Sequence, residues 1–317
     1  MVARTRYAPD RGLTARMTAT MFLLGLVFVA FVAAIVFILG AVHASGGVIV
    51  LAAVVLGGGI AIGSLFYSDK IALSTAGAQI VTPQQAPELH GVVDRICALA
   101  DMPKPRIAIS PTDIPNAFAT GRNTKHAVLC VTEGLMRRLD REELEGVISH
   151  ELSHVAHKDV TVMTVASFLA IIAGLLIRFS FYGELFGGGG RRNSNDQNSG
   201  LILLAILAVS VVVYAISFLL IRLLSRYREL AADRSGALLT GQPSALSSAL
   251  QKVSGTIARI PTKDLREAQP LNAFFFVPAL SARDAQSKIA ELFSTHPSLE
   301  KRQAQLAKIS AQLSRQQ

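Results

Sequence analysis

Four long apolar segments without a charged residue constrain the fold of this chain most strongly. They run from Met21 to Val42, from Gly46 to Tyr67, between Asp159 and Arg178, and between Gly200 and Arg222. A helix needs about 20 apolar residues to cross the hydrocarbon core of a bilayer, and each segment is close to that length. The sequence therefore predicts an integral membrane protein with four apolar helical segments, the third of which is the shortest.

The first apolar segment is expected to remain in the protein as an anchor. The arginines before it and the sequence Val42-His43-Ala44 loosely resemble a secretory signal and its cleavage site. The apolar core of a signal peptide, however, is only about 7–15 residues long, and this segment is longer.

The placement of lysine and arginine predicts the orientation in a cell (inner or plasma) membrane. Basic residues precede the first segment and follow the second and the fourth, whereas the turn at 43–47 has none; they are Arg4, Arg6, Arg11, Arg16, Lys70, Arg222, Arg226 and Arg228. Such residues favour the cytoplasmic side, so the N-terminus and residues 69–159 are predicted inside. Arg178, Arg191 and Arg192 oppose this scheme, and a re-entrant hairpin over 160–222 stays an alternative to two full spans. Topology accounts for the net charge of +9, and no nucleic-acid partner is expected.

Residues 85–159 are predicted to form a soluble α+β segment. The stretch PELHGVVDRICALA has apolar residues at helical spacing, and RIAIS, NAFAT and AVLCV are short strand-like runs between turn residues. A further helix begins at Asp140, where Glu143 completes a capping-box pattern. Cys97 and Cys130 fit no metal pattern and are predicted to be small core residues.

This helix carries the motif that indicates chemistry. His150 and His154 are four residues apart and share one helix face, so their imidazoles can bind one zinc ion. Glu151 follows the first of them and is placed to act as general base on a water molecule. The alternative is an ordinary polar helix face.

A catalytic zinc site needs a third protein ligand, and the stretch SRYRELAADRSGA at 225–237 offers one. Glu229 and Asp233 are again four residues apart on a predicted helix. Glu229 can bind the metal, and Asp233 can accept a hydrogen bond from a ligand imidazole. Two crossings, or a re-entrant hairpin, return the chain to the side of His154. The alternative is a charged helix next to the membrane.

HELSHVAHKD with the downstream RELAAD resembles the HtpX-type membrane metalloproteases, relatives of the CAAX prenyl proteases. PNAFATGR and LFSTHPSLEKR resemble further segments of that family. The resemblance implies a cytoplasmic, zincin-like (gluzincin) catalytic domain with one zinc ion per chain, which cuts damaged or misfolded membrane proteins in quality control and stress response. It implies zinc ligation by His150, His154 and Glu229, with Glu151 as base and Asp233 behind a ligand. His157 matches a variable position and is expected to face solvent.

The expected fold class is therefore α+β and mainly helical. The expected parts are a basic cytoplasmic tail (1–20), a transmembrane hairpin (21–67), the first part of the catalytic domain (68–159), a second transmembrane or re-entrant hairpin with a glycine-rich loop at 187–200 (160–224), and the second part of the catalytic domain (225–317).

Other matched residues have proposed roles around the zinc. The segment from Asn116 to Thr120 is interpreted as an edge strand on which an extended substrate lies; its binding residues are Asn116, Ala117, Phe118 and Ala119. The alternative is an internal strand of the sheet. His296 or Arg302 either stabilises the oxyanion or anchors the C-terminal helix, and Asp159 caps a helix or pairs near Lys158.

The expected partners are polypeptide or membrane-protein substrates and the lipid bilayer, and the sequence carries no signal of an oligomeric state. The zinc motif leads directly into an apolar segment, so the metal is expected close to the membrane surface. The alternative functions are a peptidase like the CAAX prenyl proteases and a non-catalytic membrane scaffold that contains zinc.

Overall fold

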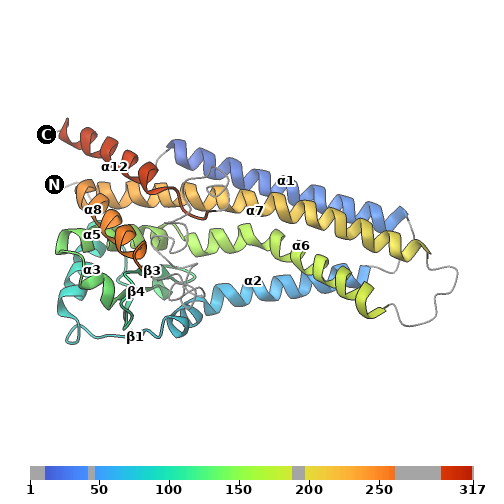
Figure 1. The fold of residues 1–317 in the computed structure, drawn as a ribbon, viewed down its shortest axis with the longest axis horizontal. Coiled ribbons are helices and arrows are strands. Elements are labelled where there is room, and N and C mark those ends of the chain that lie inside the picture. The colour runs from blue at the N-terminus through green and yellow to red at the C-terminus, as the bar shows by residue number, and fades with distance from the viewer. Residues whose placement is uncertain (1–10, 42–46, 188–196, 261–293, 316–317) are drawn as a thin grey trace. The chain divides into compact units, whose positions relative to one another are not determined.

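The computed structural model describes residues 11–41, 47–187, 197–260 and 294–315 (Figure 1). The predicted turn at 43–47 and the loop at 187–200 lie largely outside these residues, as do Arg4 and Arg6. The helices are α1 (Arg11–Ala41), α2 (Gly47–Thr75), α3 (Pro87–Ala100), α4 (Glu133–Met136), α5 (Arg141–Ala156), α6 (Asp159–Gly187), α7 (Gln197–Thr240), α8 (Pro243–Ile257), α12 (Leu299–Ser314) and the short 3-10 helix η1 (Thr124–His126). The strands are β1 (Gln79–Ile80), β2 (Arg106–Ser110), β3 (Ala117–Thr120) and β4 (Val128–Thr132).

Four of these helices are long and apolar enough to cross a membrane. The candidate spans are Arg11–Ile38 in α1, Val50–Thr75 in α2, Asp159–Ser180 in α6 and Leu201–Thr240 in α7. Large apolar side chains stay exposed along them, as expected of a lipid-facing surface; Phe37, for example, is 76% exposed. The predicted fold class, mainly helical α+β with four apolar helices, is confirmed.

The chain divides into two compact units. The helical unit consists of residues 18–64 and 163–224, and the sheet unit consists of residues 1–17, 65–162 and 225–317. In the helical unit, side chains of all four apolar helices share one core; its buried members are Phe31, Ile35, Ala53, Leu169, Ile172, Ala173, Leu176, Ile206 and Val213.

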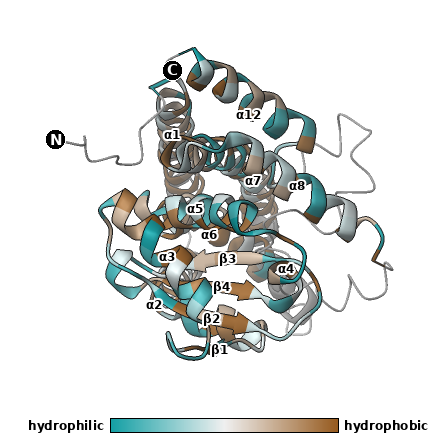
Figure 2. Ribbon diagram, turned by 90° about the vertical axis from the view of Figure 1, so that its left-hand side faces the viewer, coloured by the Kyte–Doolittle hydropathy of each residue, from teal (hydrophilic) through white to brown (hydrophobic). Residues whose placement is uncertain are grey.

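The sheet unit contains a four-stranded sheet in the order β1-β2-β4-β3. β2 and β4 are parallel, and β3 runs antiparallel to β4, with Phe118 opposite Cys130. β3 is therefore at an edge of the described sheet, and Figure 2 shows α5 beside it. The predicted strands are confirmed, and β1 is an additional strand of only two residues.

Alternating residues of the strands face two different cores. Ile107, Leu129 and Val131 belong to the larger core, to which α3, α5, α8 and α12 contribute. Ala108, Phe118 and Cys130 face Ala72, near the end of α2. Both faces of the sheet are covered, and this explains why strand β4 is buried at every residue.

The start of α5 follows the predicted capping box. Asp140 Oδ1 accepts a hydrogen bond from the Glu143 backbone N–H at 2.9 Å, and Glu143 Oε2 accepts one from the Asp140 N–H at 3.1 Å. The two side chains thereby satisfy donors that the first helical turn leaves unpaired. Val147, Ile148 and Leu152 are fully buried in the larger core, and they fix which face of α5 points toward the sheet and α8.

The fourth apolar segment and the stretch with Glu229 form one uninterrupted helix, α7, of 44 residues (Figure 1). At about 1.5 Å per residue this helix is roughly 66 Å long, whereas the hydrocarbon core of a bilayer is about 30 Å thick. Only about half of α7 can therefore lie in hydrocarbon, and the charged stretch from Arg222 to Arg234 belongs to its other half.

Candidate active site

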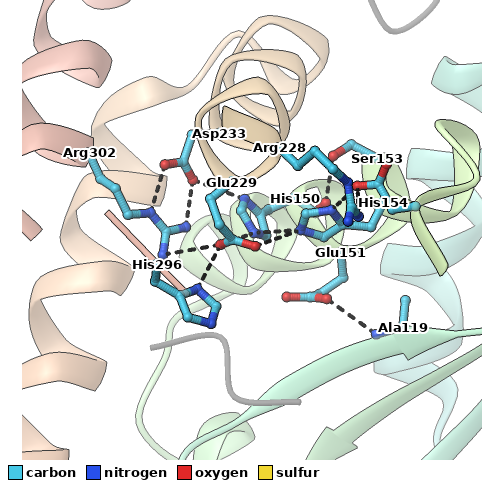
Figure 3. Close-up of polar contacts among 11 residues, drawn as sticks. Ala119, His150, Glu151, Ser153, His154, Arg228, Glu229, Asp233, His296 and Arg302 are labelled. Atoms are coloured by element: carbon cyan, nitrogen blue, oxygen red, sulfur yellow. Dashed lines mark hydrogen bonds and ion pairs between the residues drawn. The ribbon is translucent and has the colours of Figure 1, made fainter. Parts of the chain in front are cut away.

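Two imidazoles from α5 and one carboxylate from α7 converge in the sheet unit (Figure 3). The Nε2 atoms of His150 and His154 are 3.2 Å apart. Glu229 Oε2 lies 3.6 Å from Nε2 of His150, and Oε1 lies 3.5 Å from Nε2 of His154. His150 and His154 precede residues 163–224 of the helical unit in the sequence, and Glu229 follows them. The fold thus brings the three predicted ligands together across this long insertion.

These distances fit a zinc ion. Atoms bound about 2.05 Å from a tetrahedral zinc are about 3.3 Å apart, and the three separations agree with that value to about 0.3 Å. Burial lowers the pKa of His150, but the carboxylates of Asp233 and Glu229 outweigh this effect and raise the pKa to about 9. The surroundings therefore favour a cation at this position.

Asp233 lies behind the ring of His150. His150 Nδ1 lies 2.9 Å from Asp233 Oδ1, so the ring presents Nε2 to the other ligands. Arg302, on α12, donates two hydrogen bonds to the same carboxylate, from Nε at 2.7 Å and from Nη2 at 2.6 Å. Both side chains are buried, so the guanidinium compensates the carboxylate charge.

Behind His154 the structure places Asp159, to which the sequence analysis had given only a capping or local pairing role. Nδ1 of His154 lies 2.5 Å from Oδ2 of Asp159. Arg228 forms an ion pair with that same oxygen. Arg228 directly precedes the predicted ligand Glu229, which marks it as a residue close to the site. The sequence alone does not show that Arg228 pairs with Asp159.

Glu151 points toward the sheet rather than toward the other carboxylates. Its Oε2 accepts a hydrogen bond from the backbone N–H of Ala119 in β3 at 3.2 Å. Burial raises the pKa of Glu151, and the nearby imidazoles only partly offset this. A carboxylate with a raised pKa is better suited to accept and return a proton near neutral pH.

His296 and His154 lie on opposite sides of the Glu229 carboxylate (Figure 3). Its Nδ1 is 3.0 Å from Oε2 of Glu229, and Nη1 of Arg302 is 3.9 Å from the same oxygen. His157, at the end of α5, is exposed.

The edge strand β3 presents half of its backbone groups away from β4. The carbonyl of Asn116 accepts a hydrogen bond from Thr132 N–H at 3.0 Å, so Asn116 faces β4. Antiparallel pairing alternates, and Phe118 consequently also faces β4 whereas Ala117 and Ala119 face the open edge. The contact between Ala119 N–H and Glu151 agrees with this direction.

Comparisons with known proteins bear on this site. A sequence profile described as peptidase family M48 matches residues 83–310, the range that holds every site residue named above. Protease HtpX homolog 1 of Streptomyces coelicolor is 56% identical over 310 residues, which are 98% of this chain and 97% of that protein. Protease HtpX homolog of Moorella thermoacetica is 50% identical over 311 residues, 98% of each chain. The crystal structure of S. mikatae Ste24p aligns over 92% of this chain and 67% of its own, with 15% identity and a TM-score of 0.48.

Proposed function

Because the chain belongs to peptidase family M48 and is a membrane metalloprotease, we propose that it is a zinc-dependent endopeptidase of the gluzincin type. Its proposed substrates are damaged or misfolded membrane proteins, which it cuts at the cytoplasmic face in protein quality control and stress response. The observation that carries the proposal is the convergence of His150, His154 and Glu229, with Glu151 beside them.

In this mechanism the imidazoles of His150 and His154 and the carboxylate of Glu229 would hold one zinc ion per chain. When bound, zinc lowers the pKa of a water molecule to about 7 and polarises the scissile carbonyl. Glu151 takes the proton of the attacking water and transfers it to the leaving amine. The hydrogen bond from Ala119 N–H fixes the Glu151 carboxylate between the sheet and the ligands.

The edge strand β3 is the proposed substrate site. An extended peptide that pairs with the open edge would use the backbone groups of Ala117 and the carbonyl of Ala119, while Asn116 and Phe118 hold the strand on β4. Backbone pairing reads no particular side chain, and it therefore supports cleavage of many different sequences.

The contacts favour His296 over Arg302 as the group that stabilises the oxyanion. Arg302 is 2% exposed and donates two hydrogen bonds to Asp233, so its guanidinium is already used. The ring of His296 lies beside Glu229 and is a preorganised donor close to the zinc ligands. His296→Ala should lower kcat more than it weakens zinc binding, because the ring acts on the transition state.

The decisive experiment compares zinc content and proteolysis of the wild type with Glu151→Gln and Glu142→Gln. Both residues are on α5, but Glu142 is exposed and serves as the matched control. Glu151→Gln should keep stoichiometric zinc and lose cleavage of an unfolded membrane protein, whereas Glu142→Gln should keep both. Cleavage retained by Glu151→Gln would refute its role as base.

The wild type itself distinguishes the alternatives. Cleavage of a prenylated CAAX peptide and of no unfolded membrane protein would indicate a peptidase of the prenyl type. Zinc without any cleavage would indicate a scaffold.

The proposed orientation is supported by the arginines and lysine that follow the second and fourth spans. A cysteine introduced at Ser194, between the third and fourth segments, should react with an impermeant thiol reagent from outside the cell. A cysteine introduced at the exposed Lys104 should not. The native Cys97 and Cys130 are buried and contribute little background.

A further inference from the structure

Each of the two ligand imidazoles is backed by a buried carboxylate that is itself held by an arginine. The first chain of contacts is His150–Asp233–Arg302, and the second is His154–Asp159–Arg228. In both chains the aspartate contacts Nδ1, which leaves Nε2 directed at the other ligands. The second chain involves no residue to which the proposed function gives a role apart from His154.

The second chain depends on a local break between two helices. α5 ends at Ala156 and α6 begins at Asp159, and between them Lys158 has a positive φ of 56°. A left-handed backbone conformation is uncommon for a residue that has a Cβ atom. The turn brings the carboxylate of Asp159 back onto the ring of His154, five residues earlier in the chain.

His154 needs such a contact more than His150 does. The side chain of His150 is 1% exposed and enclosed by the surrounding core, whereas that of His154 is 14% exposed. Packing alone therefore restrains the ring of His154 less, and the hydrogen bond to Asp159 makes a larger contribution to its orientation.

Arg228 completes the second chain from a different helix. It is buried, precedes the ligand Glu229 on α7, and forms an ion pair with Asp159 at the start of α6. An unpaired carboxylate at the position of Asp159 would be strongly disfavoured, because burial removes its hydration. The ion pair between Arg228 and Asp159 also holds the part of α7 that carries Glu229 against the start of α6.

We propose that Asp159 and Arg228 are positioning residues of the metal site, with Asp159 fixing the ring of His154 and Arg228 holding Asp159. The inference rests on the proposed zinc site. It adds Asp159 and Arg228 to the residues that determine the zinc affinity of that site. Removing such a partner typically weakens metal binding by about 10–100-fold.

The test measures zinc affinity of the purified full-length chain by competition with a chelator, together with the melting temperature after chelator treatment. Asp159→Ala should bind zinc about 10–100-fold more weakly. Arg228→Met should also weaken binding, Arg228→Lys should restore part of it, and the double variant should be no worse than Asp159→Ala alone. Asp113→Ala, which removes the ion pairs of the exposed Asp113 with Arg137 and Arg138, is the matched control and should bind as the wild type does.

Each outcome decides the inference. If Asp159→Ala binds zinc within about twofold of the wild type, Asp159 does not position His154, even if the melting temperature falls. If Arg228→Met weakens binding equally with and without Asp159, Arg228 does not act through it. If Asp159→Ala does not fold, Asp159→Leu decides, because leucine is close to aspartate in size but cannot accept a hydrogen bond from the ring of His154: weaker zinc binding supports the inference and unchanged binding overturns it. A wild type that binds no zinc would refute the proposed function instead.

Discussion

Replacing Gly236 by alanine should disturb the metal site without touching any ligand. Gly236 is on α7, and a Cβ added there would lie 3.0 Å from the backbone N of His150 and 3.3 Å from its Cα. The Ser149 hydroxyl also donates to the Gly236 carbonyl at 3.3 Å, so the backbones of α5 and α7 are in close contact here. This contact sets the distance between the imidazoles on α5 and Glu229 on α7.

The magnitude follows from the geometry. An ordinary contact of about 3.4 Å requires α5 and α7 to separate by roughly 0.4 Å, because 3.4 minus 3.0 is 0.4. That shift would lengthen the separation of His150 Nε2 from Glu229 Oε2, already 3.6 Å, to about 4.0 Å, beyond the roughly 3.3 Å that zinc requires. Overpacking costs about 1–3 kcal/mol, and the better helix propensity of alanine returns about 1 kcal/mol. We therefore expect a loss of stability of up to about 2 kcal/mol, and at least a tenfold loss, about 1.4 kcal/mol, in zinc affinity.

The assay combines thermal unfolding in detergent with zinc competition, and Gly255→Ala is the matched control. Gly255 is also within a helix, α8, but it is exposed and an added Cβ would meet nothing within 4 Å. Gly255→Ala should gain up to about 1 kcal/mol and leave zinc affinity unchanged. The reasoning is refuted if Gly236→Ala binds zinc as tightly as the wild type and melts as high as Gly255→Ala.

Native thiol titration at pH 8 should detect neither cysteine, since burial raises the pKa of Cys97 to about 11 and that of Cys130 to about 12; rapid labelling of the folded protein would contradict this. The acidic limb in the pH profile of kcat/KM should lie above 4.5, the ordinary pKa of a glutamate side chain. Burial raises the pKa of Glu151, and the base is lost when falling pH protonates this carboxylate. A limb below 4.5 would argue against Glu151 as the base. Gly134→Ala should cost about 3 kcal/mol or more, because the added Cβ would lie 2.1 Å from the carbonyl oxygen of Asp113, and a melting temperature equal to the wild type would disprove the close contact.

Local patterns predicted much of the fold and the centre of the site. The helix over 87–100 follows from its apolar spacing, and the start of α5 follows from Asp140 and Glu143, because both features involve residues within one or two helical turns. His150 and His154 could be paired because a spacing of four on a helix fixes a shared face. Glu229 could be added because a zinc site needs a third ligand on the same side of the membrane.

The role of Asp159 could not be predicted, because it depends on a left-handed residue at position 158 and on an arginine from another helix. The tight contact at Gly236 is equally invisible in the sequence, since it depends on how two distant helices approach. The continuity of α7 was not predicted, because the fourth apolar segment and the helix with Glu229 were treated separately, although arginine, leucine, glutamate and alanine are all good helix formers.

The order of the ligands along the chain also bears on biosynthesis. A polypeptide still emerging from the ribosome carries both imidazoles before it carries the carboxylate of α7, and two apolar segments must be made in between. The group of three side chains in the proposed zinc site is therefore complete only after α7 has been made.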